Sequence, residues 1–502
     1  MLVAVALGAL VIVIVWKCTS ANESYPPYAP GRLPVIGHLH HLAGKITVQE
    51  LFRRWSLQKG PIFTVQLGVK RWVILNSMDA VNKLIVERST VYSSRNLPDT
   101  LVNDLFYGVS NGGGFAFYPY GKEWRFLRRI AHNVLVLRKI DLYQPIIDER
   151  RNTLIKNIWD ASSKHDHQKA LQLTMFIEHY TMTTILAIAF GKMCSFTPGD
   201  PKLHEAFALT ERSAALLGPS EQIREFFPVL NMILPSARAE FIDVRRKMSA
   251  FYGGLLEEFK AQSDPDDCFV KEVLAKGELT DLQIATFVTL FVGAGSETTA
   301  STLEWMIALL ANHPEIQDKA YNEIKEAVGL DHLPTHEDES LLPYLQCIIL
   351  ETLRLRPPAP LSVPHATSED DVYQNWFIPA NTTVIMNLHA IHQDPSQYPE
   401  PEKFIPERHM SFVETGSKKF SQTTKDRPHL AFSTGRRVCV GIHLAERSLF
   451  MAASALVSCF KFEREGDDLV NVKEPRDIRS PTFAPLPYKV RIVRRQNDIS
   501  II

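Results

Sequence analysis

The sequence predicts a mainly α-helical globule with a small β subdomain. From about residue 120 to 355 the apolar side chains recur mainly with helical periodicity. Residues 61–78 are rich in Val and Ile and alternate in places between apolar and polar, which is typical of a β-hairpin. No repeat, low-complexity tract or domain boundary is evident after residue 40, so we expect one large folded unit.

Composition excludes several classes of protein. The 502 residues have a formal net charge of −1, a sequence pI near 7.0 and an apolar fraction of 45%. A nucleic-acid partner usually requires a basic excess, so none is expected. The six cysteines are scattered without a Cys-x-x-Cys pair. This pattern fits neither a zinc site nor a secreted disulfide scaffold and favours a reducing environment.

The N-terminus departs from this globular pattern. Residues 1–16 contain no charged side chain, and Lys17 follows them. A cleaved signal peptide would usually carry a basic residue before the apolar run, whereas a membrane-spanning helix usually needs ~20 apolar residues. The cation after the run favours a cytosolic C-terminal side. We favour a transmembrane anchor at 1–16, a linker and proline-rich hinge at 17–40, and a globular domain at 41–495.

Further along the chain, breaks in the pattern separate the predicted elements. The glycine run at 112–114 predicts a mobile loop before a new helix. The longest helix is predicted from Thr280, a plausible N-cap, to Asn312, and it is apolar on almost all sides. A further helix is predicted over 341–355 and short strands over 370–386. No Gly-x-x-x-x-Gly-Lys or Gly-x-Gly-x-x-Gly pattern suggests a nucleotide site.

The strongest local motif surrounds Cys439. Gly435 and Gly441 permit tight backbone turns on either side of this cysteine, which precedes the last predicted helix. Amide groups at a helix start and the nearby Arg437 would favour a thiolate. A lone cysteine at such a place is usually a small buried residue. The glycines, the arginine and Phe432 at fixed offsets favour a functional role instead.

This motif, Phe-x-x-Gly-x-Arg-x-Cys-x-Gly, resembles the haem-binding loop of the cytochrome P450 family at every specified position. The resemblance implies a cytochrome P450 fold around heme b (iron protoporphyrin IX). In that fold Cys439 would be the axial ligand of the iron, Phe432 would pack against the loop, and Arg437 would pair with a haem propionate. Thiolate ligation pushes electron density onto the iron and favours O–O cleavage.

A second family motif lies upstream. Glu351 and Arg354 fall one turn apart on a predicted helix, and alone they would be a surface pair of little energetic value. The family has a buried Glu-x-x-Arg here, completed by an arginine that Arg408 matches. The family's usual aromatic residue after that arginine is His409 in this chain. The resemblance implies that Glu351, Arg354 and Arg408 form a structural charge network.

A third motif, Gly-Ala-Gly-Ser-Glu-Thr-Thr, occupies residues 293–299 of the long apolar helix. Helix packing could explain the glycines, but an acid is costly there without a partner. The segment resembles the family's oxygen-binding groove. There, the small residues make room for dioxygen, Thr298 would hydrogen-bond it, and Glu297 would relay protons through water. These two are the predicted catalytic residues.

Three further positions are carried over from the family. Trp124 and Arg128 lie four residues apart on one helix face and match the family's Trp-x-x-x-Arg beside the haem. Alone, this spacing would indicate only a core tryptophan. His365 falls where many members place an Arg or His near the other propionate. Trp124, Arg128, His365, Phe432, Arg437 and Cys439 are thus the predicted haem-binding residues, with Cys439 as the metal ligand.

The resemblance covers nearly the whole chain and implies a monooxygenase that hydroxylates or epoxidises a lipophilic small molecule. Electrons would come from a separate NADPH-dependent flavoprotein reductase, docking near Lys122, Arg125 and Arg129, with cytochrome b5 as a second candidate donor. The implied location is the endoplasmic reticulum membrane, single-pass, with a cytosolic catalytic domain. Two alternatives stay open: a haem-thiolate isomerase or dehydratase that does not use dioxygen, and a non-enzymatic haem sensor.

Overall fold

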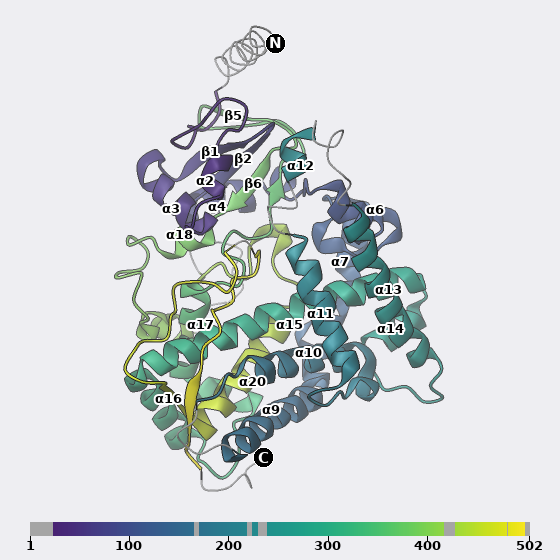
Figure 1. The fold of residues 1–502 in the computed structure, drawn as a ribbon, viewed down its shortest axis with the longest axis vertical. Coiled ribbons are helices and arrows are strands. Elements are labelled where there is room, and N and C mark those ends of the chain that lie inside the picture. Colours follow the sequence, from purple (N-terminus) through teal and green to yellow (C-terminus); the bar gives the residue numbers. More distant parts are fainter. Residues whose placement is uncertain are drawn as a thin grey trace, which may run out of the picture.

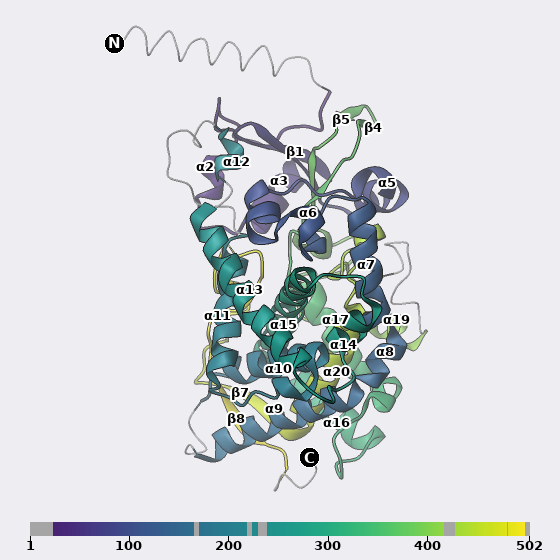
Figure 2. The ribbon, with the colours of Figure 1, turned by 90° about the vertical axis from the view of Figure 1, so that its right-hand side faces the viewer.

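The computed structural model describes residues 24–164, 170–217, 223–228, 238–415, 427–478 and 480–496. Strands β1, β2 and β6 gather at one end of the molecule, and long helices fill the other end (Figures 1 and 2). The strand-bearing end also holds the first described residues of the chain. The mainly helical fold with a small β part is therefore confirmed.

Helices of very different lengths are found at both ends of the molecule (Figure 1). The longer ones are α3 (Val48–Lys59), α7 (Lys122–Leu135), α9 (Gln144–Lys164), α10 (Thr174–Phe190), α11 (Pro201–Ala215), α13 (Arg238–Lys260), α14 (Phe269–Lys276), α15 (Asp281–Asn312), α16 (Pro314–Ala327), α17 (Pro343–Leu355) and α20 (Ile442–Cys459). Short helices connect them: α2 (Leu39–Leu42), α4 (Met78–Val81), α5 (Ser89–Tyr92), α6 (Gly108–Asn111), α8 (Leu137–Leu142), α12 (Ile223–Phe226), α18 (Leu388–His392) and α19 (Met410–Glu414).

The main sheet has the strand order β1-β2-β6-β3. Strands β1 (Ile62–Leu67) and β2 (Lys70–Leu75) form the predicted antiparallel hairpin. Strand β6 (Thr383–Met386) pairs in parallel with β2, and β3 (His365–Ala366) pairs antiparallel with β6. Two antiparallel pairs lie outside this sheet: β4 (Asp371–Tyr373) with β5 (Trp376–Ile378), and β7 (Phe460–Arg464) with β8 (Val490–Arg494).

Helix α15 runs through the middle of the helical end, as Figure 2 shows. Its N-terminus is fixed by a capping box, in which the Thr280 side chain accepts from the Gln283 N–H and the Gln283 side chain accepts from the Thr280 N–H. Most of its side chains after Ile284 are buried. The predicted bounds of this helix, from the Thr280 cap to Asn312, are confirmed, so its length is set by local signals at both ends.

The glycine run predicted to be a mobile loop is closely packed instead. A Cβ atom on Gly113 would lie 2.4 Å from the Phe287 backbone nitrogen of α15. On Gly112, a Cβ atom would lie 1.7 Å from the Phe106 carbonyl oxygen. Only residues without a side chain allow this approach of the loop to the helix backbone. The run therefore attaches the loop to α15.

The predicted location in the endoplasmic reticulum membrane is corrected by the structure. Among the described residues, no helix is long and apolar enough to cross a membrane. The longest apolar helix, α15, carries Glu297 and Glu304 and lies inside the helical end of the molecule. The predicted anchor at residues 1–16 falls outside the described residues. The single-pass membrane location is therefore withdrawn.

Candidate functional site

A large internal cavity lies between α15 and the loop that precedes α20. Side chains of α7, α10, α15 and α20 line it, together with residues 431–441 and 358–363. Apart from three arginines, Cys439 and several hydroxyl groups, the lining is mostly apolar and includes Phe115, Phe287 and Phe291. Phe115 and Phe287 stack with 5.3 Å between ring centroids. A cavity of this kind suits an apolar molecule.

Cys439 faces this cavity from the loop before α20. The loop is closed by a hydrogen bond from the Cys439 N–H to the Phe432 carbonyl oxygen, 2.9 Å long. Gly435 adopts φ +65°, and a Cβ atom there would lie 2.7 Å from the Ile85 carbonyl oxygen, so the turn needs glycine. Cys439 is exposed, although it lies within the protein, because its surface borders the cavity.

The protein alone does not make Cys439 a thiolate. Helix α20 begins at Ile442, three residues after the cysteine, so Cys439 precedes the helix, as predicted. Burial raises the pKa of the Cys439 thiol, while the Gly441 N–H and the charge of Arg128 act in the opposite direction. A metal ion deprotonates a coordinating thiol outright. The site therefore fits a cysteine that ionises when it binds a metal.

Basic side chains approach the cavity from several elements. Arg128 of α7 donates to the Val438 carbonyl oxygen at 2.6 Å. Arg437 donates to the carbonyl oxygens of Ser93 and Tyr118 at 2.8 and 2.7 Å. Its guanidinium lies 4.3 Å from the ring centroid of Trp124. Trp124, Arg128 and Arg437 all border the cavity, so the structure brings these predicted haem-binding residues together.

His365 is held behind this group by strand β3. Its Nδ1 lies 2.8 Å from the Tyr92 carbonyl oxygen, and because a carbonyl only accepts, Nδ1 carries the proton. Its Nε2 is buried without a hydrogen-bond partner. Burial, followed by the charge of Arg95, lowers the pKa of His365 well below its usual value. His365 is not among the residues that border the cavity.

Arg95 is a basic residue of the site that the sequence analysis missed. It borders the cavity and donates to the carbonyl oxygens of Val363 and Pro364. Nothing in its local sequence distinguishes Arg95 from a surface arginine. Its role was missed because its partners lie far away in the chain. Among the described residues, the side chains of Arg95, Arg128 and Arg437 have no carboxylate partner.

This group of cations fits the two propionates of a haem. Arg95 Nε, Arg437 Nη1 and His365 Nε2 are buried without hydrogen-bond partners. Burial and then the repulsion from Arg95 and Arg128 lower the pKa of Arg437 to about 8. Buried cations that repel one another lower the stability of the protein, and a bound anion reverses this effect. A porphyrin has an apolar ring and two anionic propionates. It therefore suits an apolar cavity that is bordered by unsatisfied donors and by a cysteine.

Of the two predicted catalytic residues on helix α15, one borders the cavity and the other does not. Thr298 borders the cavity, and its hydroxyl donates to the Ala294 carbonyl oxygen at 2.7 Å. Glu297 is not among the lining residues; its Oε2 accepts from the Thr482 hydroxyl at 3.3 Å. Burial raises the pKa of Glu297 to about 7. A Cβ atom on Gly295 would lie 2.9 Å from the Cδ1 atom of Ile185 on α10, so a larger residue here would displace that side chain.

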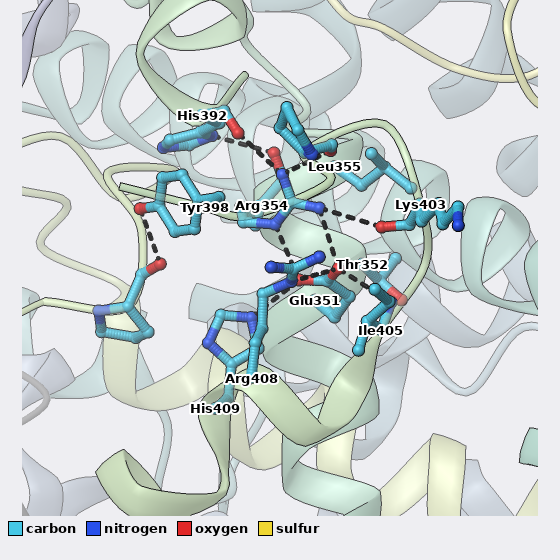
Figure 3. A network of polar contacts seen from close by, with 12 residues as sticks. Glu351, Thr352, Arg354, Leu355, His392, Tyr398, Lys403, Ile405, Arg408 and His409 are labelled. Atoms are coloured by element: carbon cyan, nitrogen blue, oxygen red, sulfur yellow. Dashed lines mark hydrogen bonds and ion pairs between the residues drawn. The ribbon is translucent and has the colours of Figure 1, made fainter. Parts of the chain in front are cut away.

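Glu351 and Arg354 are fully buried, and Arg408 and His409 lie next to Glu351 (Figure 3). Arg354 donates to both Glu351 oxygens at 2.7 and 2.8 Å, and Arg408 Nε donates at 3.0 Å. His409 Nε2 adds a further contact of 2.8 Å. These hydrogen bonds outweigh burial and hold the pKa of Glu351 at about 2. The predicted charge network is confirmed, and His409 belongs to it.

His392 connects this network to the cysteine loop. Its Nδ1 lies 2.9 Å from the Arg354 carbonyl oxygen, and the Leu430 N–H donates to its Nε2 at 2.9 Å. One ring nitrogen must donate and the other must accept, so the imidazole is neutral with its proton on Nδ1. The backbone that leads into the cysteine loop is thereby attached to α17.

Comparisons with known proteins agree with this geometry. The family model of cytochrome P450 matches residues 26–491. Cytochrome P450 monooxygenase verL of Clonostachys rogersoniana is 30% identical over 500 residues, which cover 96% of this chain and 89% of that protein. Cytochrome P450 monooxygenase fogE of Aspergillus ruber (strain CBS 135680) is 31% identical over 512 residues, covering 99% and 92%.

A solved structure agrees with the fold. A zebra fish cytochrome P450, determined with progesterone, superposes with a TM-score of 0.74 at 24% identity, covering 90% of this chain and 100% of that one. The family match spans nearly all of the described chain, and the curated relatives above are monooxygenases. The chain therefore belongs to the cytochrome P450 family, as an enzyme of the monooxygenase class that uses haem.

Proposed function

We propose that this protein uses heme b to insert one atom of dioxygen into a lipophilic small molecule, by hydroxylation or epoxidation. The observation that carries the proposal is the placement of Cys439 and Thr298 on the same cavity, beside cations without carboxylate partners. When bound, a haem supplies the redox and dioxygen chemistry that side chains lack. Cys439 would be its axial ligand, with Phe432 beside the loop.

The basic residues would orient the cofactor. Arg128 and Arg437, which border the cavity, would offer guanidinium donors to the propionates, and Trp124 would offer its indole N–H. His365 can donate from Nε2 only as an imidazolium, because its Nδ1 proton is already engaged with Tyr92. A carboxylate next to His365 would therefore stabilise the protonated ring.

Thr298 and Glu297 would handle protons on the opposite side. The Thr298 hydroxyl donates to Ala294, which leaves its oxygen lone pairs available to accept in the cavity. Glu297, with a pKa of about 7, can hold or release a proton near neutral pH. Glu297 would have to rotate or act through water, because its carboxyl group bonds to Thr482 instead of bordering the cavity.

The substrate class follows from the cavity wall. Phe115, Phe287 and Phe291 provide flat apolar surfaces, and few polar groups besides the threonines of α15 lie on that side. Progesterone accompanies the fold neighbour, so a molecule of steroid size is compatible with the fold. A steroid, a terpenoid, a fatty acyl chain and an aromatic compound all match this wall.

Electrons would come from a separate NADPH-dependent flavoprotein reductase, with cytochrome b5 as a second donor. Lys122 and Arg125 lie on the helix that carries Trp124. Arg129 of the same helix pairs with Glu278 at 2.9 Å, so its charge is partly neutralised. Charge reversal at Lys122 and Arg125 together should slow reduction at low salt and leave the haem spectrum intact. Equal slowing by Lys325→Glu on α16, or no slowing, would contradict this docking site.

The alternatives differ in what they consume. An isomerase or dehydratase needs neither reductase nor dioxygen, and a haem sensor turns over nothing. The proposed function is tested by adding reductase and NADPH to the purified protein with a lipophilic substrate that shifts the Soret band. We expect dioxygen consumption, an oxygenated product, and the absorption band of a thiolate-ligated ferrous–carbonyl adduct. Cys439→Ser should abolish that band and turnover; a product formed without dioxygen would favour the isomerase.

A further inference from the structure

Beside Glu297, carboxyl groups from several helices gather around one cation. Glu178 of α10 and Glu304 of α15 pair with Arg476, at 3.6 Å and 3.3 Å respectively. The field of Glu178 also raises the pKa of Glu297, as does that of Glu211 on α11, while Arg476 opposes them. Arg476 therefore pairs with two carboxyl groups, and the charges of Glu178, Glu211 and Arg476 act on Glu297 nearby.

Charge balance indicates that this cluster retains protons at neutral pH. Fully ionised, the acids would leave a net negative charge in a region with little water, and such a charge is costly. Burial raises the pKa of Glu297 and of Glu304 to about 7, and it also raises the pKa of Glu178. The carboxyl groups of Glu297 and Glu304 are thus close to half-protonated at neutral pH.

One loop supplies both polar contacts that control the cluster. The described parts of the loop 472–485, residues 472–478 and 480–485, carry Arg476, which bridges Glu178 and Glu304, and Thr482, which donates to Glu297. The loop is fixed by a hydrogen bond from the Arg476 N–H to the Ala484 carbonyl oxygen at 2.8 Å. The Phe483 carbonyl oxygen also accepts from the Trp305 indole of α15 at 2.7 Å. The two contacts therefore cannot move independently of α15.

The cluster extends from solvent to the centre of α15. The side chains of Arg476 and Glu178 are 39% and 32% exposed, whereas that of Glu304 is 3% exposed. The ion pairs of Arg476 therefore lead from the partly exposed Glu178 to the buried Glu304, which lies on the same helix as Glu297. Each proton donated toward the cavity is replaced by one from water, so the transfer needs no further reactant.

We propose that the loop 472–485 controls proton supply to the catalytic site, with Arg476 and Thr482 as positioning residues. Thr482 holds the carboxyl group of Glu297, and Arg476 sets how many protons Glu178 and Glu304 retain. This inference rests on the proposed monooxygenase function. It predicts that substitutions far from the haem ligand change how protons reach the site without changing the cofactor or the substrate pocket.

The holoenzyme can be tested by infrared difference spectroscopy of protonated carboxyl groups between pH 5 and 9. Glu297→Gln and Glu304→Gln identify the two bands. Thr482→Val removes a hydrogen bond to the carboxylate, so the midpoint of the Glu297 band should rise by about one pH unit. Arg476→Gln should raise both midpoints, whereas Thr482→Ser and Arg476→Lys should restore them. Unchanged midpoints would overturn the proposal.

A second readout separates proton supply from a merely structural role. With reductase and substrate, Thr482→Val and Arg476→Gln should divert severalfold more NADPH electrons to hydrogen peroxide and shift the pH profile. Substrate affinity and the carbon monoxide spectrum should stay unchanged. Shifted midpoints with unchanged peroxide yield would reject the control of proton supply. A protein without oxygenase activity would fail the function test, yet its infrared titration would still report the cluster.

Discussion

At the scale of single residues, His409 shows how a departure from a motif can be accommodated. An aromatic side chain usual at this place would only pack, whereas His409 Nε2 donates to Glu351 Oε2 at 2.8 Å. Burial lowers the pKa of His409, and the contact with Glu351 opposes this shift. The carboxylate thus has a neutral donor in addition to its two arginines, which adds a hydrogen bond without adding charge.

Replacing His409 by Phe should destabilise the fold moderately. The variant removes one donor from a buried carboxylate that keeps Arg354 and Arg408, so the free energy of unfolding should fall by about 1–3 kcal/mol. Glu351→Gln should cost more, about 3–5 kcal/mol, because it leaves buried guanidinium groups without their anion. Urea unfolding measures both. His204→Phe, at an exposed position of α11, is the control; equal losses for all three would refute the ranking.

The residues of the site that could be predicted from sequence are those whose partners are close in the chain or fixed by a motif. Trp124 and Arg128 are one turn apart, and the loop around Cys439 is local, so both were found. Arg95 was not, because its role depends on the carbonyls of Val363 and Pro364. The contact between Thr482 and Glu297 was missed for the same reason.

At the scale of elements, local signals define helices well and long-range pairing poorly. The capping box at Thr280 and the turn before Pro314 determine α15. The hairpin of β1 and β2 was also evident from alternation. By contrast, nothing near residue 383 indicates that β6 pairs in parallel with β2, since that pairing is set by the whole fold. Three consecutive glycines indicated mobility, whereas close approach to α15 explains them.

Substituting Gly113 by Ala should loosen the contact between this loop and α15. Its Cβ atom would lie 2.4 Å from the Phe287 nitrogen, so the loop or the helix must shift. We expect a stability loss of about 1–3 kcal/mol and weaker binding of substrates that contact Phe115. Soret titration and urea unfolding measure the two effects. Gly121→Ala is the matched control, because nothing lies within 4 Å of a Cβ atom there; similar behaviour would count against the explanation.

At the scale of the whole molecule, buried neutral histidines make stability depend on pH. Burial lowers the pKa of His392 to about 3, and it also lowers that of His409 and, further, that of His429. In the unfolded chain these groups titrate near 6.5. As the pH falls below that value, the unfolded state binds protons that the folded state does not, so the free energy of unfolding falls.

Below pH 6.5, the free energy of unfolding should fall by about 1.4 kcal/mol per pH unit for each such histidine. Urea unfolding at pH 7.5 and 5.5 should therefore show a marked loss of stability on the acid side. His392→Asn should lower stability at pH 7.5 but reduce the dependence on pH. His204→Asn, at an exposed site, should leave the dependence as it is. A stability that is the same at both pH values would contradict the assignment of neutral rings.

The cations at the cavity also have a consequence for how the molecule is assembled. Arg95 comes from a segment next to the main sheet, whereas Arg128 and Arg437 belong to α7 and the cysteine loop. Positive groups from the two ends of the fold therefore face each other across one space and repel. A bound anion would attract the cations of both ends and hold the two ends together. Loading the cofactor thus completes the architecture as well as the chemistry.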